Sequence, residues 1–340
     1  MPKGQCTVIT PDITMTRPPN EHWRQWLYPV LVLFVTISWL VYMTLADRWT
    51  LFADLWPISL TMVAGSFVAG ATPGGGAAVA LPVFTKILKI PTTDAAHFGL
   101  MIQAVGMMMA SVMILVKRVP VLPKVIIWTT VGGFYGIVMG TYWMIIPDPF
   151  PKILFTFVVT AFGIALIISR WVINLPPQNA LPEWSSRRAA QFVLIGFIGG
   201  LFASSTGSAL DMVTFMVLTL AFGINEKIGT PTSVIIMALN SVIGFFLHAV
   251  ISQNIGVAWN YWLVAVPIVI IGAPFGAFCA SIFKRETIII LLLVLIAGEL
   301  VTTIWLVPFS AVAIVIATIA ALTCAIIFYA MIRYRLRMAR

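Results

Sequence analysis

Long apolar runs recur along the whole chain, and they leave few folds open to it. Each run has about 20 residues, the length that a helix needs to cross roughly 30 Å of hydrocarbon. With 61% hydrophobic and only 9% charged residues, the chain has too little polar surface for a water-soluble globule. The sequence therefore predicts an all-α polytopic membrane protein with about eight transmembrane helices. The eight clear runs lie near residues 27–46, 95–116, 122–146, 152–173, 228–251, 258–282, 287–306 and 309–332.

Two further apolar segments, near 56–90 and 190–223, are too long for one straight helix and are broken in the middle. The first contains "AGATPGGGAAVALP" at residues 69–82, and the second contains "ASSTG" at residues 203–207. Glycine and proline are the poorest helix formers. Irregular backbone is tolerated at membrane depth only where protein or a water-filled cavity satisfies its N–H and C=O groups. We therefore expect the tips of both segments to line a cavity.

Basic residues set the expected orientation. Arginines concentrate directly after the last apolar run, which is typical of a cytoplasmic end. A single crossing by 190–223 would place the arginines between 170 and 188 outside, whereas a re-entrant hairpin keeps them inside. With both broken segments read as hairpins, the chain makes eight crossings and both termini are cytoplasmic. Lys86, Lys89 and Lys152 count against this topology because all three then fall outside.

The two broken segments resemble one another. Each is followed by three spans, and a hairpin plus three spans makes an odd number of crossings, so the second copy enters the membrane upside down. Such inverted repeats are typical of secondary transporters, whose binding site lies near the midplane. A shift of 131 residues superimposes Gly65 on Gly196, Gly76 on Gly207, Ala78 on Ala209 and Phe84 on Phe215.

The predicted organisation follows from these repeats. Repeat 1 covers residues 55–174 and repeat 2 covers 188–306. A cytoplasmic tail (1–26) and an extra helix (27–50) precede them, and a helix with a basic cytoplasmic tail (308–340) follows. We expect a multi-pass protein of the cell membrane whose partners are the lipid bilayer, a small anion and a coupling proton or ion.

The tips have the residues of an anion site. Thr72 is placed to cap a helix that starts at Pro73, and glycines 74–76 let the backbone approach a ligand closely. A helix start offers free N–H groups and a partial positive charge, which suit a small oxyanion such as sulfite, a sulfonate or a carboxylate. Close helix packing and interhelical hydrogen bonds are the alternative explanation for the same residues. The predicted substrate-binding residues are Thr72, Gly74, Gly75, Gly76, Ser204, Ser205, Thr206, Gly207, Ser208, Gln103, Thr230 and Asn240.

Three ionisable residues are candidates for coupling. Asp211 follows Ser208 at capping-box spacing, so it either caps a helix or carries a proton. Glu299 lies well inside an apolar run, where an ionisable group is expensive and is a functional candidate by default. His97 and His248 lie near span ends, where an interfacial position is the simpler interpretation, and His97 is retained as a coupling candidate.

Other classes of ligand are disfavoured. The net charge of +9 resides largely in loops and tails, which argues against nucleic-acid binding. Cys6, Cys279 and Cys324 form no metal-ligand or disulfide pattern. The sequence contains no nucleotide-binding loop, so no cofactor and no ATP-driven step are expected.

Three stretches resemble the TauE/SafE family of sulfite and organosulfonate exporters. They read "GSFVAGATPGGGAAVALPVF", "GFIGGLFASSTGSALDMVTFMVL" and "EKIGTPTSVIIMALNSVIGFF", and the "IGTPTS" element at 228–233 is the most specific. The resemblance covers about 55–306 and implies an exporter of a small sulfur-containing or similar organic anion. The first half departs from the family pattern, with "HFGL" at 97–100 in place of a Gly-Thr-Ser type stretch.

Two other functions were weighed against a secondary transporter. A passive anion channel would share the glycine-rich tips without a coupling residue. An intramembrane hydrolase would use Ser205 or Ser208 as nucleophile and His248 as base. No G-x-S-x-G stretch supports the hydrolase, so we expect a protein that is not an enzyme.

Overall fold

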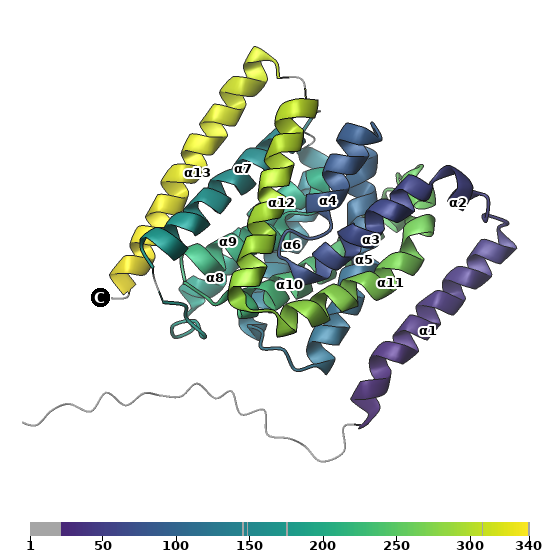
Figure 1. Ribbon diagram of the computed structural model, residues 1–340, viewed down its shortest axis with the longest axis horizontal. Coiled ribbons are helices and arrows are strands. Elements are labelled where there is room, and N and C mark those ends of the chain that lie inside the picture. The colour runs from purple at the N-terminus through teal and green to yellow at the C-terminus, as the bar shows by residue number, and fades with distance from the viewer. Residues whose placement is uncertain (1–21, 145, 148, 175, 308, 339–340) are drawn as a thin grey trace, which may run out of the picture.

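The computed structural model describes residues 22–338 apart from 145, 148, 175 and 308, and every regular element in this part is a helix (Figure 1). Most of the predicted N-terminal tail lies outside the described residues. The elements are α1 (His22–Leu45), α2 (Leu51–Asp54), α3 (Trp56–Ala71), α4 (Ala77–Leu81), η1 (Pro82–Ile87), α5 (Thr92–Val116), α6 (Pro123–Trp143), α7 (Phe150–Ile167), η2 (Ile168–Val172), α8 (Ser186–Thr206), α9 (Leu210–Leu220), α10 (Glu226–Phe246), η3 (Leu247–Ile251), α11 (Ala258–Ile282), α12 (Arg285–Leu306) and α13 (Ala311–Met338), where η marks a π-helical turn.

Nine helices in the described residues are long and apolar enough to cross a membrane. Eight of them coincide with the eight predicted runs, which confirms a polytopic all-α protein. The ninth is α8, with 21 residues, which the sequence analysis assigned to the first limb of a hairpin. The other hairpin helices, α3 and α9, are shorter, with 16 and 11 residues. The length of α8 therefore does not decide whether it crosses the membrane, and the positions of the ends of α8 and α9 bear on this question.

The ends of α8 and α9 lie side by side. The Gln178 N–H, in the segment before α8, donates to the Gly223 carbonyl after α9 at 2.7 Å, and the Asn225 N–H donates back to Gln178 at 2.8 Å. Phe192 of α8 also stacks on Phe222, with ring centroids 5.7 Å apart. The chain thus returns to the end from which α8 starts. This is the path of the predicted re-entrant hairpin, whose depth in a bilayer stays a prediction.

Both breaks fall on the predicted small-residue stretches. The first tip comprises residues 72–76 between α3 and α4, and the second comprises 207–209 between α8 and α9. Gly75 and Gly207 have φ of 59° and 73°, a left-handed conformation that glycine adopts without strain. Figure 1 shows α4 turning back toward the end from which α3 starts.

The two predicted repeats exchange their broken helices. α3 packs along α11, while α8 packs along α6. Under the predicted repeats, α8 is the counterpart of α3 and α11 the counterpart of α6, so the two contacts would be equivalent. Both are close backbone contacts, because a β-carbon at Gly276 would overlap Phe67 and one at Gly136 would overlap Phe197. α1 and α13 lie at opposite edges of this arrangement (Figure 1).

Ion pairs and arginine contacts connect several helices at one end of the molecule, which we call the basic end. The Arg285 guanidinium binds both carboxylate oxygens of Glu226, joining α12 to α10. Arg170 of η2 pairs with Glu286 at 3.0 Å. Arg335 of α13 donates to the Pro176 carbonyl at 2.6 Å. Pro176, in the segment that leads to α8, thus lies at this end.

Candidate functional site

Gln103 of α5 joins the two tips. Its Nε2 donates to the Gly207 carbonyl at 2.8 Å and to the Gly99 carbonyl, on its own helix, at 3.0 Å. Its Oε1 lies 3.5 Å from the Ser208 hydroxyl. Only 3% of Gln103 is exposed, so these bonds form away from water. The structure therefore places the predicted residues Gln103, Gly207 and Ser208 together.

Gly75 brings the first tip against the second. A β-carbon at Gly75 would lie 2.9 Å from Oδ2 of Asp211, 3.1 Å from Oγ of Ser208 and 3.3 Å from Oε1 of Gln103. A larger residue would have to displace these side chains, and the left-handed φ adds strain for any of them. The two tips meet as the inverted repeat predicts, and we call this contact the tip junction (residues 75, 103, 207, 208 and 211).

The expected cap at Thr72 is wrong. Thr72 ends α3, and its Oγ1 donates to the Val68 carbonyl at 3.0 Å. Pro73 lies in the turn, and the next helix begins only at Ala77. Three glycines with one in the left-handed region prevent a helix from starting at Pro73.

Asp211 is also placed differently from the capping-box expectation. The residue before α9 is Ala209, with φ of 96°, so Ser208 does not cap that helix. Oδ1 of Asp211 accepts a hydrogen bond from the Met212 N–H at 2.9 Å. Oδ2 has no hydrogen-bond partner among the described residues, and it faces Gly75. Asp211 thus lies at the tip junction with one carboxylate oxygen uncommitted.

The hydroxyl residues of the second broken segment divide into two groups. Thr206 ends α8 directly before the second tip, and its hydroxyl donates to the Ser208 carbonyl at 2.7 Å. Ser204 donates to the Leu201 carbonyl and lies against Gly140 of α6. Ser205 is half-buried on α8. Of these four hydroxyl residues, Ser208 lies in the second tip and Thr206 lies next to it.

Thr230 and Asn240 of α10 make contacts other than those of the tip junction. Asn240 is fully buried, donates to the Ile236 carbonyl at 2.9 Å and packs against Gly133 of α6. Thr230 lines a small crevice together with Lys227. The position of Asn240 against Gly133 fits close helix packing, whereas the Thr230 hydroxyl has no hydrogen-bond partner among the described residues.

A small cavity adjoins the tip junction. Gly76, Gln103 and Thr206 line it, and its other walls are mainly apolar, including Phe84 and Phe98. The centre of a water molecule can occupy about 20 Å³ of it. That volume holds roughly one water. The contacts of Gly75 with Ser208 and Asp211 show that the tips are closed on each other in this conformation.

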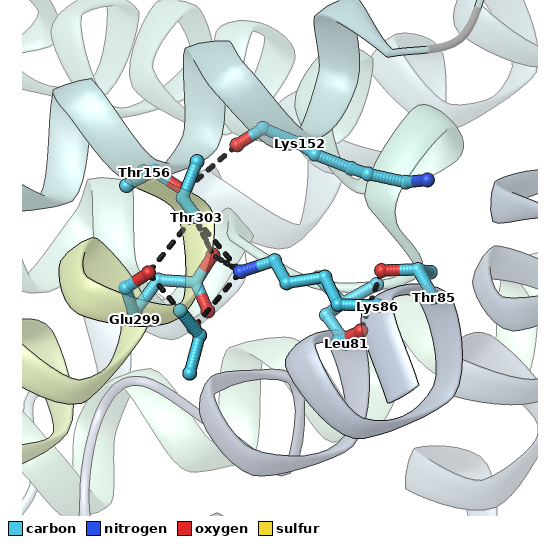
Figure 2. Close-up of polar contacts among 8 residues, drawn as sticks. Leu81, Thr85, Lys86, Lys152, Thr156, Glu299 and Thr303 are labelled. Carbon is cyan, nitrogen blue, oxygen red and sulfur yellow. Dashed lines mark hydrogen bonds and ion pairs between the residues drawn. The ribbon is translucent and has the colours of Figure 1, made fainter. Parts of the chain in front are cut away.

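A second buried polar cluster lies between η1, α7 and α12 (Figure 2). Nζ of Lys86 donates to Oε1 of Glu299 at 3.0 Å, to the Thr302 hydroxyl at 3.1 Å and to the Thr303 hydroxyl at 2.8 Å. The Thr156 hydroxyl lies 2.7 Å from the same carboxylate oxygen. The side chains of Lys86 and Glu299 are 2% and 4% exposed. All three ammonium hydrogens are thus used.

The sequence analysis did not predict that Lys86 would be buried in an ion pair, whereas Lys89 is exposed. The missed signal was available in the sequence. Lys86 is a basic residue in one apolar segment and Glu299 an acidic residue in another, and buried opposite charges are expected to pair.

His97 and His248 form a buried pair. Their ring centroids are 4.2 Å apart, and 7% and 3% of the two residues are exposed. Nδ1 of His248 lies 2.9 Å from Oδ1 of Asn254. Nε2 of His248 has no hydrogen-bond partner among the described residues, so neither Ser205 nor Ser208 is hydrogen-bonded to it.

The profile of the family described as Sulfite exporter TauE/SafE matches residues 58–306, well over half of the chain. The chain belongs to the TauE/SafE family. The match confirms the resemblance over 55–306, and transport is the activity of this family. Within the TauE/SafE region lie both tips, Gln103, Lys86 and Glu299, whereas α1 and α13 lie outside it. Comparisons with curated proteins and with solved structures gave no match.

Proposed function

We propose that this TauE/SafE protein is a secondary transporter that exports a small sulfur-containing or organic anion, such as sulfite or a sulfonate. The anion binds between the two tips. The observation that carries the proposal is the tip junction, where broken helices of both repeats meet around Gln103. Inverted-repeat transporters bind their substrates where such broken helices meet.

The groups at the junction suit an anion. α9 and the helical limb formed by α4 and η1 both begin there, and the first N–H groups of a helix have no intrahelical partner. Each helix start stabilises a nearby anion by about 0.3–2 kcal/mol. The hydroxyl of Ser208 adds a charge-assisted hydrogen bond.

The anion is held by neutral donors in this proposal. Lys86, the cation on the return limb of the first hairpin, already binds Glu299 and two threonines. Neutral donors give moderate affinity and allow release, which a transporter requires. Asp211, Glu299 and His97 remain the candidates for coupling to a proton or an ion.

The closed junction favours a transporter over a passive channel. Sulfite, with one sulfur and three oxygens, needs more space than the single water that the cavity holds. The tips therefore separate to admit an anion, which is the behaviour of an alternating-access protein. A channel would instead show flux that does not saturate.

Two measurements on the purified protein test the proposal. Sulfite, alkanesulfonates and short carboxylates are screened by thermal shift, where a bound anion raises the melting temperature. The anions that stabilise the protein are then assayed for flux into proteoliposomes. We expect saturable flux for at least one of them. Stabilisation by none of them, or flux that rises linearly with concentration, contradicts the proposal.

A further inference from the structure

On the basis of the proposed function, we propose that Lys86 and Glu299 form the proton-linked site of the transporter. A proton binds Oε2 of Glu299 when the anion binds at the tip junction, and it leaves when the anion leaves. The cluster in Figure 2 would then select the coupling ion, while the tips select the anion.

The two oxygens of Glu299 have different surroundings. Oε1 accepts from Lys86 and lies within hydrogen-bond distance of the hydroxyls of Thr156 and Thr303. Oε2 is buried and has no hydrogen-bond partner among the described residues. A proton from water can therefore bind a lone pair of Oε2 without breaking a bond in the cluster. The charge of the Lys86–Glu299 pair then changes from zero to one positive charge, which resides on Lys86.

The second repeat makes the equivalent contact without charges. There α9 packs on α7 through apolar side chains, including Phe215 and Phe162, whose ring centroids are 6.0 Å apart. The counterpart of Lys86 under the shift of 131 residues is Val217. Buried ion pairs are generally no more stabilising than well-packed apolar residues of similar volume. Packing alone therefore does not explain the charged pair in repeat 1.

Proton binding and anion binding favour each other in this arrangement. A buried positive charge without a counter-charge is unfavourable. Lys86 lies on the helical limb that begins at the first tip, ten residues after Gly76, and ten residues of helix span roughly 15 Å. An anion at the tips therefore stabilises the protonated cluster, and by linkage the protonated cluster binds the anion more tightly.

Charged groups from two other elements face this pair or compete with it. Lys152 of α7 lies close to Lys86, where its positive charge opposes protonation of Glu299 in the absence of an anion (Figure 2). Asp211 at the tip junction and His97 beside His248 are the competing positions for a coupling proton. The experiment has to distinguish proton binding at Glu299 from proton binding at Asp211 or His97.

The test measures the affinity of the purified protein for methanesulfonate, whose own charge is constant between mildly acidic and mildly alkaline pH. The wild type should bind about tenfold more tightly at the acidic pH. Glu299→Gln mimics the protonated carboxyl, so it should keep the tight affinity at both pH values. Lys86→Met removes the positive charge, so it should keep the weak affinity at both. Lys89→Met, the same change at an exposed lysine, should behave as the wild type.

Folding is controlled by the double variant Lys86→Met/Glu299→Met, which replaces the pair by apolar residues and should bind independently of pH. A wild-type affinity that does not change with pH overturns the inference. So does a pH dependence that survives in Glu299→Gln and disappears in Asp211→Asn or His97→Gln.

A second readout needs no anion. If methanesulfonate and the other probe anions fail to bind the wild type at either pH, the proposed substrate class fails. Infrared spectroscopy then follows the carboxylic-acid band that Glu299→Gln removes. Growth of this band on acidification of the wild type supports a proton-binding Glu299. An ionised Glu299 down to the pH of unfolding overturns the inference.

Discussion

Gln103 connects the tips through a single buried amide group. The Gly207 carbonyl that it binds lies just after the end of α8. Loss of the Gln103 amide would therefore leave this buried acceptor unpaired. An unpaired buried group costs about 1–3 kcal/mol. Gln103→Leu should lower the free energy of unfolding by about that amount and abolish transport, as measured by denaturation and flux.

The matched control for Gln103→Leu is Ser111→Ala on the same helix. Ser111 is buried, but it donates only to the Met107 carbonyl one turn away. Its loss should cost less than about 1 kcal/mol and leave transport unchanged. Equal effects of the two variants would mean that Gln103 is an ordinary core residue.

Ser208 should matter more for the anion than Ser205. Ser208 lies at the tip junction, whereas Ser205 lies on α8. A hydrogen bond to a charged group is worth about 1.5–3 kcal/mol, so Ser208→Ala should weaken anion binding roughly tenfold or more, with a milder effect of Ser205→Ala. Isothermal calorimetry measures both. The opposite order would place the anion along α8.

At the scale of residues, sequence reasoning succeeded where the backbone pattern was decisive. Glycines 74–76 and Gly207 marked the breaks because glycine is unfavourable in helices. Gln103 was found as a polar residue in an apolar run. The pairing of Lys86 was missed because the lysine was considered only in the membrane topology, while its partner, Glu299, is 213 residues away. The prediction that Thr72 caps a helix was wrong because, after the three glycines, the next helix begins only at Ala77.

Among the elements, the contact of α6 with α8 depends on close backbone approach. A β-carbon at Gly136 would overlap the carbonyl oxygen of Phe197. Gly136→Ala should therefore destabilise the protein by about 1–3 kcal/mol. Gly298→Ala is the control, because a β-carbon there meets nothing within 4 Å. Thermal unfolding in detergent compares them, and equal stability would refute the contact.

The hairpin path of α8 and α9 predicts which loops share a side of the membrane. The 174–189 loop should be cytoplasmic with both termini, and the 252–257 loop outside, because this satisfies the charge bias. Single cysteines are placed at Ala180 and Asn254 in a chain without its native cysteines, and an impermeant reagent is added to intact cells. Only the Asn254 position should react. Labelling of the Ala180 position from outside would contradict the hairpin.

The sequence predicted the boundaries of the membrane spans. These boundaries did not decide whether α8 crosses the membrane or returns with α9. Apolar length identified eight helices, and small residues identified both breaks. The full 21 residues of α8 were not expected, because its first turn includes Arg187 and Arg188. Its return with α9 is instead visible in tertiary bonds, such as that between Gln178 and Gly223.

For the whole molecule, the exchange of broken helices carries more weight than the sequence repeat. Four identities at a shift of 131 residues are weak on their own. The paired contacts of α3 with α11 and of α8 with α6 relate the repeats independently of residue identity. Small residues such as glycine are enough to allow this close helix packing.

The central claim is that the tip junction binds the transported anion, and flux through Gly75→Val tests it most directly. The control is Gly256→Val, which has the same kind of left-handed φ, 57°, but no atom within 4 Å of a β-carbon. Proteoliposomes containing the wild type or either variant are assayed with labelled sulfite or methanesulfonate, after a check that each inserts equally. The wild type and Gly256→Val should show saturable flux, and Gly75→Val should show none, because valine blocks the backbone approach. Wild-type flux in Gly75→Val would contradict the account and make the tips a packing feature.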